Sequence, residues 1–276
     1  MLFFTFCVNI NRHSIFCLKN ALNILLKSLH KNLKIYKLIC YTNFKLNMPK
    51  KYNIELRNYY DKSKIKLYND KWLNLSFNKI NIYKDLYDEF KKDFIWIDLD
   101  TIVTTDISYI NDLSNIFIEN GGIINIKNKL FKNNNIINVP RNRYIQGNFW
   151  KLNIELYKKL MVTLIILIKK KLILNFDLQD LFNYYIYIEN KGELNDIYIL
   201  GNNVHKNTIN GLAVWSKKGN THATLDGLNN FYIKNNKLRS KYYPNKNIDI
   251  LSFTFFTLNK LYNTDKFNKL FYCNII

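Results

Sequence analysis

Two carboxylates, Asp98 and Asp100, are the residues of this sequence whose spacing is best suited to chemistry. They directly follow the apolar residues Phe94-Ile-Trp-Ile, and such continuous apolarity predicts a strand buried on both faces inside a parallel sheet. Because side chains alternate along a strand, both carboxylates should point the same way while Leu99 points into the core. Neighbouring carboxylates repel each other unless a cation lies with them, which predicts a Mn²⁺ or Mg²⁺ site.

A divalent cation held by these carboxylates would keep coordination positions open for phosphate oxygens. By bridging the carboxylates and a diphosphate, it would neutralise the charge that builds on a departing nucleoside diphosphate, which is the chemistry of glycosyl transfer. The simpler interpretation is that two Asp residues end a strand and begin a turn, as they often do in α/β proteins. The buried strand, and its place after a β-α-β unit, favour the metal site.

That β-α-β unit is predicted at the start of the chain. Residues Leu2 to Val8 form an apolar run that predicts a strand, and Ser14 is a suitable N-cap for a helix through Leu29. A second strand is predicted from Ile35 to Cys40. Two strands joined by a helix predict a parallel sheet, with ligands gathered at the carboxyl ends of its strands.

The rest of the chain continues the alternation of helices and strands that is typical of an α/β fold. Residues 43–70 are polar and predicted to be irregular, and Asp106 to Asn120 is predicted as a short helix or turn. No repeat or Gly/Ser- or Pro-rich linker divides the chain, so one catalytic domain is expected over residues 1–276. The other predicted elements are helices at Trp72 to Phe90, from Ile154 and from Asp177, and strands at Asp93 to Asp100, Ile123 to Ile126 and Asp196 to Leu200.

The segment Ile95-Trp-Ile-Asp-Leu-Asp-Thr-Ile-Val resembles the DxD segment of GT-A-fold glycosyltransferases, particularly the family-8-like bacterial enzymes that build lipopolysaccharide and related surface glycans. The resemblance implies a GT-A-like, Rossmann-like fold with a twisted, largely parallel sheet flanked by helices. It implies a nucleotide-sugar-binding half at about 1–106 and an acceptor-side half at about 107–276. It also implies that Asp98 and Asp100 bind Mn²⁺ or Mg²⁺ and that, with Leu99, they contact a UDP-sugar donor.

Three further segments carry the resemblance on the donor side. Leu2 to Asn9 resembles the opening nucleotide-binding strand of the family, which implies a donor contact for Asn9. The segment that ends Ser76-Phe-Asn-Lys resembles the helix that bears a basic residue near the donor, so Lys79 would face the donor. The segment Tyr144-Ile-Gln-Gly-Asn-Phe-Trp resembles the stretch that lines the sugar pocket, which implies contacts from Gly147 and Asn148, although the usual Asn-x-Gly order is absent.

A fourth segment, Phe176-Asp-Leu-Gln-Asp-Leu-Phe-Asn, resembles the DQDxxN helix start of the family near the acceptor. It departs from that pattern because Leu178 is inserted between Asp177 and Gln179. The resemblance implies that Gln179 contacts the bound donor. The alternative is that the segment is only a helix N-cap followed by an acidic residue, since both suit the helix dipole.

Two roles in the acceptor-side half have more than one candidate residue. Asp180 would orient an acceptor hydroxyl or take its proton, and Asp226 is the competing base. The family also uses a late His as a third metal ligand, and the sequence offers His222 and His205. We prefer His222, because it lies in a Gly-containing loop that would let its side chain reach a metal.

The chain is strongly basic, with a formal net charge of +20. Nearly all of the positive charge is Lys, and the scarcity of Arg argues against sequence-specific nucleic-acid binding, since base readout leans on bidentate Arg forks. The charge is consistent with a diffuse attraction to anionic lipid or to a sugar nucleotide. The expected partners are a nucleotide-sugar donor, a glycan or lipid-linked acceptor, and the surface of an anionic membrane.

The apolar stretch Leu160 to Ile168 is far shorter than the roughly 20 residues that cross a bilayer. Lysines precede and follow it, which suits a buried helix with solvated ends or an interfacial helix. The four cysteines show no metal or redox spacing, and the N-terminus lacks a basic leader. A cytoplasmic location, with association at the inner face of the membrane, is therefore expected.

Two other classes of protein compete with the transferase. Asp98-Leu-Asp-Thr also resembles the opening DxDxT of haloacid-dehalogenase-type phosphatases, in which Asp98 would be the nucleophile. That motif normally follows the first strand and needs a later acidic pair, but the sequence has no adjacent Asp-Asp. The other alternative is a non-catalytic protein that binds polyanions or membranes through its charge, which would leave the two carboxylates unexplained.

Overall fold

The structure is a computed structural model of the chain. It describes residues 1–10, 13–60, 71–119, 127–129, 137–140, 144–170, 172, 178–193, 195–201, 208–209, 213–214, 231–241, 243–253, 258 and 262–272.

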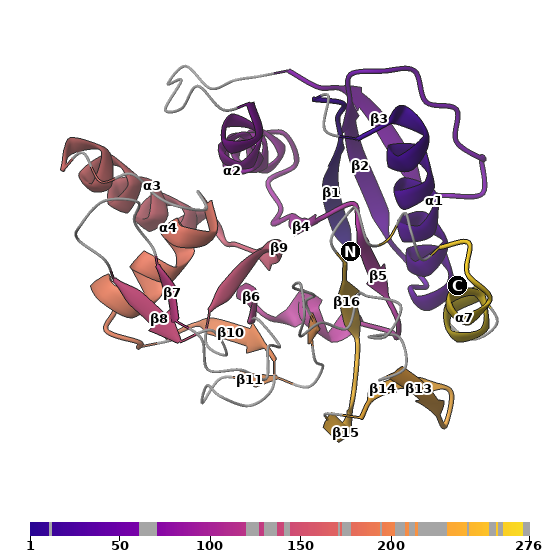
Figure 1. Cartoon of the computed structure of the whole chain (residues 1–276). Helices are drawn as coiled ribbons and strands as arrows, with labels where there is room; N and C mark the ends of the chain where they lie inside the picture. The colour runs from indigo at the N-terminus through magenta and orange to yellow at the C-terminus, as the bar shows by residue number, and fades with distance from the viewer. Residues whose placement is uncertain are drawn as a thin grey trace.

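An eight-stranded sheet forms the centre of the fold (Figure 1). Its described strand pairs are parallel except for those made by β9, which runs antiparallel to both of its neighbours, β4 and β6. The prediction of an α/β fold with a largely parallel sheet is therefore confirmed. Because β9 is reversed, its first residues lie at the edge where the neighbouring strands end. Across the sheet the order is β11 (Thr208–Ile209), β10 (Ile197–Leu200), β6 (Asn115–Glu119), β9 (Ile145–Lys151), β4 (Ile95–Ile97), β1 (Leu2–Cys7), β2 (Lys37–Thr42) and β3 (Ile54–Asn58).

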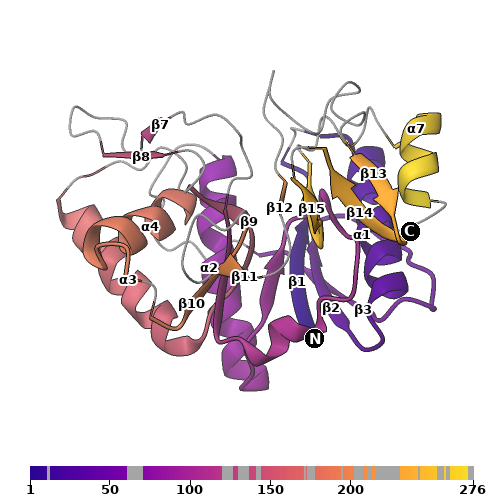
Figure 2. The ribbon, with the colours of Figure 1, turned by 90° about the horizontal axis from the view of Figure 1, so that it is seen from below.

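Helices cover both faces of this sheet, so its central strands are buried on both faces and consist mainly of apolar residues. Successive residues of one strand enter opposite cores: Phe3 packs in the core that includes α1 (Ile15–Asn32), and Phe4 packs in the other core. The second core includes residues of α2 (Lys71–Phe90), α3 (Ile154–Lys169) and α4 (Leu178–Tyr184). Figure 2 shows α1 on one side of the central strands and α2 and α3 on the other.

The predicted start of the first helix is confirmed. Ser14 is the N-cap of α1, and its Oγ accepts a hydrogen bond from the backbone N–H of Cys17 at 3.2 Å. Such a bond satisfies a backbone donor that has no partner within the helix. The apolar stripe of α1 then packs on the sheet through Leu18, Leu22 and Leu25, as its spacing predicts.

Smaller elements surround the central sheet. One three-stranded sheet contains β5 (Thr101–Val103), β16 (Ile250–Ser252) and β12 (Ala213–Val214), and it receives the chain directly after β4. A second three-stranded sheet contains β13 (Phe231–Lys234), β14 (Lys237–Ser240) and β15 (Tyr243–Asn247). The remaining elements are the pair β7 (Lys127–Lys129) and β8 (Asn138–Pro140), the 3₁₀ helix η1 (Ser108–Asp112), the π-helical turns η3 (Tyr185–Glu189) and η4 (Asn268–Tyr272), and α7 (Asp265–Phe267).

Three predicted segments differ from the structure. The strand expected from Asp93 to Asp100 ends at Ile97, because the chain turns there to enter the other sheet. The segment Asp106 to Asn120, expected as a short helix or turn, contains the 3₁₀ helix η1 as expected, but it continues into the strand β6, whose residues are buried between β9 and β10. Residues 43–70, expected to be irregular, contain β3, whose polar residues suit the exposed edge of the sheet. The strand predicted at Ile123 to Ile126 lies outside the described residues.

Candidate functional site

The two predicted metal-binding carboxylates lie on a turn that joins two sheets. Strand β4 ends at Ile97, residues 98–100 form the turn, and β5 begins in the neighbouring sheet, antiparallel to β16. The Asp98 N–H donates to the Asn148 carbonyl at 2.8 Å, and the Asp100 carbonyl accepts from the Phe253 N–H at 2.9 Å. Leu99 between them is buried in the core, as predicted. The turn is therefore anchored at one end to β9 and at the other to the residue that follows β16.

The carboxylate of Asp98 is held by two donors. Its Oδ1 accepts from Lys79 Nζ at 2.9 Å and from Trp96 Nε1 at 2.8 Å. Lys79 Nζ also lies 4.3 Å from the centroid of the Trp96 ring, which is a cation–π distance. The structure therefore brings together Lys79 and Asp98, both predicted site residues. Trp96 is a member of this cluster that the sequence analysis did not identify, although its position two residues before Asp98 was a usable signal.

Asp100 lies in an environment that disfavours its charge. Burial raises the pKa of its carboxyl group well above the usual value, and the negative charge of Asp98 raises the pKa further, while Lys79 acts in the opposite direction. A carboxylate whose ionisation is opposed by burial and by a neighbouring negative charge is stabilised by a cation. Mg²⁺ and Mn²⁺ prefer oxygen ligands, so Asp98 and Asp100 are a suitable pair to hold either ion, which would offset the charge of a bound diphosphate.

Among the residues that the structure describes, no group of three His, Cys, Asp or Glu side chains is placed to hold a metal ion. His222, His205 and the alternative base Asp226 lie outside the described residues. The strand β12 ends at Val214 and is parallel to β16, so its carboxyl end points towards the end of β5 that begins after Asp100. The site therefore offers two protein carboxylates from its described part.

Asn148 lies next to Asp98 at a bulge in β9. The register of β9 against β6 jumps from Trp150 opposite Phe117 to Gln146 opposite Ile118, so the intervening residues are unpaired on that side. The Asn148 side chain is only 6% exposed, and within the described structure neither its Nδ2 nor its Oδ1 has a hydrogen-bond partner. A buried amide without partners is destabilising by roughly 1–3 kcal/mol. Such a group is best explained by a ligand or water that completes its bonds.

The bulge is supported by side chains of α4. The Gly147 N–H donates to Gln179 Oε1 at 2.8 Å, and a Cβ atom added to Gly147 would lie 2.6 Å from Gln179 Cγ. Asn183 Oδ1 accepts from the Ile145 N–H, and Asn183 Nδ2 donates to the Ile145 carbonyl, both at 2.9 Å. These amides therefore take the place of a partner strand, and the predicted site residues Gly147, Asn148 and Gln179 are neighbours in the structure.

Asp180, the first candidate for a catalytic base, lies deeper than these residues. Its side chain is 0% exposed, and its Oδ1 accepts from the Tyr144 hydroxyl at 2.7 Å. Burial, and then the charge of Asp180, raise the pKa of Tyr144. In this structure Asp180 is thus a buried partner of Tyr144 at the start of β9, and its role as a base stays a prediction.

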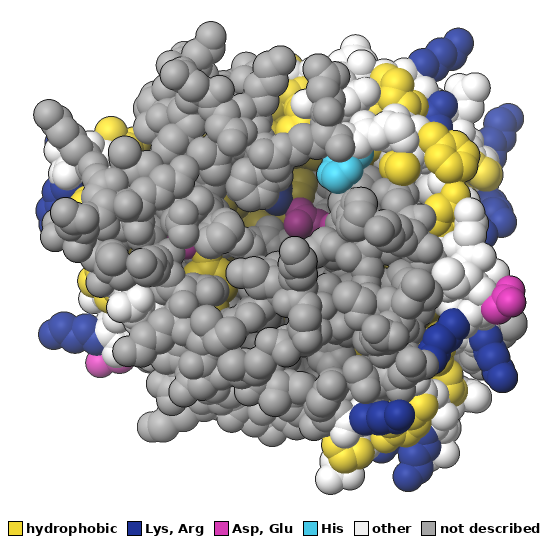
Figure 3. Space-filling view, viewed as in Figure 1, with side chains coloured by type: hydrophobic (Ala, Val, Ile, Leu, Met, Phe, Trp, Pro, Cys, Tyr) yellow, Lys and Arg dark blue, Asp and Glu magenta, His cyan; other side chains and the backbone are white. Residues whose placement is uncertain are grey.

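Asn9 lies in the loop after β1, at the same edge of the sheet as Asp98, because β1 and β4 are parallel neighbours. Its N–H donates to Asn43 Oδ1 at 2.8 Å, and its carbonyl accepts from Asn43 Nδ2 at 2.9 Å. These two bonds join the loops that follow β1 and β2. Figure 3, which looks at one face of the molecule, shows acidic atoms in magenta near its centre, with hydrophobic and basic atoms beside them.

No protein-family model matches this sequence, and no curated protein is significantly similar to it. None of the helices in the described part of the chain combines the length and the apolarity that a membrane span requires. The function must therefore be argued from the site itself.

Proposed function

We propose that the protein is a metal-dependent glycosyltransferase of the GT-A fold that moves a sugar from a nucleotide-sugar donor to a glycan or lipid-linked acceptor. The single observation that carries this proposal is that the Asp98 turn is hydrogen-bonded to the backbone of Asn148, whose buried side-chain amide has no hydrogen-bond partner within the described structure. The carboxylates suit a cation and its diphosphate, while the amide suits the sugar attached to them. Surface-glycan synthesis of the lipopolysaccharide, lipooligosaccharide or capsule type is the process we expect.

The chemistry of the amide favours a sugar. An Asn side chain offers both an acceptor oxygen and donor N–H groups, and a sugar hydroxyl can donate and accept at once. A phosphate dianion only accepts, so it would leave the Oδ1 of Asn148 without a partner. This argument favours a sugar nucleotide over the phosphate ester that a haloacid-dehalogenase-type phosphatase would bind.

The proposed donor complex gives each neighbouring residue a role. Asp98 and Asp100 would hold Mn²⁺ or Mg²⁺, which supplies positive charge against the diphosphate. Lys79, which pairs with Asp98 at 2.9 Å, would stay beside the phosphates and balance the charge that the leaving group gains. Asn148 would orient the transferred sugar, and the Gln179 contact would keep the bulge in place behind it.

The test measures binding and turnover on the full chain. Thermal stabilisation and Mn²⁺-dependent hydrolysis are recorded with UDP, UDP-glucose, UDP-galactose and UDP-N-acetylglucosamine. In Asp100→Asn every metal-dependent effect should fall at least about tenfold, as expected for loss of a metal ligand. In Asn148→Ala the stabilisation by UDP should persist, whereas the extra stabilisation by the UDP-sugar should be lost. Asp112→Asn, an exposed carboxylate on η1, is the matched control and should behave as the parent.

Other outcomes would replace the proposal. An Asp100→Asn protein with unchanged metal-dependent binding would remove the carboxylate pair from the mechanism. Release of phosphate from para-nitrophenyl phosphate, abolished by Asp98→Ala and independent of sugar nucleotides, would identify a phosphatase. Binding of heparin or nucleic acid with steep salt dependence, unaffected by Asp98→Ala and without any response to nucleotides, would identify a polyanion-binding protein.

A further inference from the structure

The helix α3 is apolar on two faces. Its inner face, with Leu156, Leu160, Leu164 and Leu167, is buried in the core against the sheet. A helix that packs on a sheet normally presents polar residues on the opposite face. In α3 that outer face instead carries exposed β-branched side chains: Val162 is 59% exposed, Ile165 49% and Ile166 36%.

Lysines lie at both ends of this outer apolar stripe. Positions three and four apart share one side of a helix, so Lys158 and Lys159 lie one turn before Val162. At the other end, Lys169 lies one turn after Ile165 and Ile166. The lysine side chains are exposed, and Lys158 is held by Glu155 at 2.7 Å. The outer face therefore has an apolar centre with positive charge at each end.

We infer that this outer face of α3 docks on an anionic lipid bilayer, with the helix parallel to the membrane plane. The exposed Val and Ile side chains would enter the boundary between headgroups and acyl chains, while the lysines would contact anionic headgroups. The net charge of +20 adds a long-range attraction to such a surface. The predicted alternative, a buried helix with solvated ends, describes the inner face and the lysines of α3 but leaves the exposed Val162, Ile165 and Ile166 without a role.

A second copy of the chain fits the same face less well. If two α3 helices packed through their apolar centres, Lys158 and Lys159 of one copy would face either their own counterparts or Lys169 of the other copy. Both orientations bring like charges together beside an apolar contact, which is unfavourable. An anionic bilayer instead pairs every one of these lysines with opposite charge.

The membrane contact does not depend on the proposed catalytic activity. It does complement a lipid-linked acceptor, since α3 follows β9, the strand that carries Asn148, with only Leu152 and Asn153 between them.

The experiment is sedimentation of the full chain with vesicles, in the absence of nucleotide. The vesicles contain phosphatidylcholine alone or with about one-third phosphatidylglycerol, a typical anionic surface. We expect the parent to bind the anionic vesicles and to dissociate as salt is raised. The triple variant Val162→Ser, Ile165→Ser, Ile166→Ser should bind at least about tenfold more weakly, because its apolar contact with the acyl boundary is gone.

Matched controls separate the face of α3 from general properties of the surface. Phe16→Ser with Ile35→Ser removes exposed apolar side chains elsewhere and should bind as the parent. Lys158→Gln with Lys169→Gln should weaken binding by roughly fivefold per lysine, and by more than the equally charged change Lys50→Gln with Lys51→Gln. Circular dichroism and urea unfolding check that each variant is folded.

Three results would overturn the inference. The first is a parent that ignores anionic vesicles, and the second is a triple variant that binds them as well as the parent. The third is a parent that sediments as a dimer and becomes monomeric in the triple variant, which would assign this face to a second copy of the chain. Stabilisation of the triple variant by UDP-sugars reports separately on the proposed catalytic function, so the two proposals can fail independently.

Discussion

Asn148 and Lys151 are two buried polar side chains of β9. They lie towards opposite ends of the sheet's strands and differ in their hydrogen bonds. Each is 6% exposed. Lys151 Nζ donates to the carbonyls of Ile110, Asn111 and Leu113 at 3.2, 2.9 and 2.6 Å. The Asn148 amide has no hydrogen-bond partner within the described structure. The two side chains are therefore equally buried. The Lys151 ammonium group uses all three of its donors, whereas the Asn148 amide uses neither its donors nor its acceptor within the described structure.

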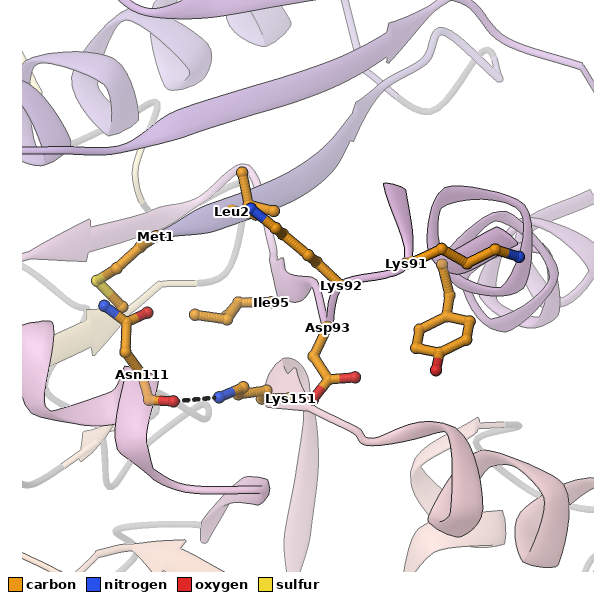
Figure 4. Close-up of a pocket in the computed structure, with 9 residues that line it drawn as sticks. Met1, Leu2, Lys91, Lys92, Asp93, Ile95, Asn111 and Lys151 are labelled. Carbon is orange, nitrogen blue, oxygen red and sulfur yellow. Dashed lines mark hydrogen bonds between the residues drawn. The ribbon is translucent and has the colours of Figure 1, made fainter. Parts of the chain in front are cut away.

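The surroundings of Lys151 explain why it is a structural residue. Burial lowers the pKa of its ammonium group, and the nearby charges of Asp93 and Asp112 oppose that change. Figure 4 shows Lys151 and Asp93 on the wall of a cavity of about 570 Å³, with the bond from Lys151 to Asn111 as a dashed line. All three ammonium donors are used to hold η1, so none is left for a ligand. Burial alone does not mark a functional group, whereas a buried polar group without a partner requires an explanation such as a ligand or a water molecule.

The largest effect on the free energy of unfolding is expected from substitution of Lys151. In Lys151→Met the three carbonyls of η1 and its flank lose their donor, and the free energy of unfolding should fall by about 3 kcal/mol. Urea unfolding followed by circular dichroism measures this change. Lys158→Met, at an exposed salt bridge, is the control and should change stability by less than about 0.5 kcal/mol. Equal stability of the Lys151 variant and the parent would show that burial, and not hydrogen bonding, is the relevant difference.

The second-largest effect on the free energy of unfolding is expected at Asn183, a buried residue of α4 that bonds to Ile145 of β9. It is compared with Asn148, a buried residue within β9. Asn183 makes three hydrogen bonds, to Ile145 N, Ile145 O and Gln179 O, so Asn183→Ala should lower the free energy of unfolding by about 2 kcal/mol. Asn148→Ala removes a side-chain amide that makes no hydrogen bond to the described residues, and the relief of desolvation should offset the lost packing to within about 1 kcal/mol. Unfolding of both variants without ligand makes the comparison. A strongly destabilised Asn148→Ala would mean that its amide is structural.

A smaller loss of stability than in Lys151→Met or Asn183→Ala is expected at Gly147, whose N–H joins the bulge of β9 to Gln179 of α4. A methyl group there meets Gln179 Cγ at 2.6 Å and displaces the bond to Gln179 Oε1, so Gly147→Ala should lower stability by about 1–2 kcal/mol. Adding Gln179→Ala should relieve the clash, and the double-mutant cycle measures the coupling. Strictly additive losses would show that the bulge does not depend on this contact.

Local patterns in the sequence were sufficient for several parts of the fold. The apolar run of β1, the Ser14 cap and the stripe of α1 each act within a few residues, and each forms as predicted. The carboxylate pair was also identifiable, because an apolar strand that runs into two Asp residues is a local signal. The sequence did not reveal β3 or β6, since β3 is a polar edge strand and β6 depends on two neighbours that are distant along the chain.

The site as a whole arises from contacts between distant segments. The Lys79 contact with Asp98 spans 19 residues, and Asp98 meets Asn148 only because β9 pairs antiparallel with β4. The bulge in which the Asn148 amide has no partner among the described residues depends on the register of β9 against β6 and on the amides of α4. Residue types and spacing thus specified which groups could do chemistry. Strand pairing decided which of them meet, because register is set by packing across the sheet rather than by neighbours in the chain.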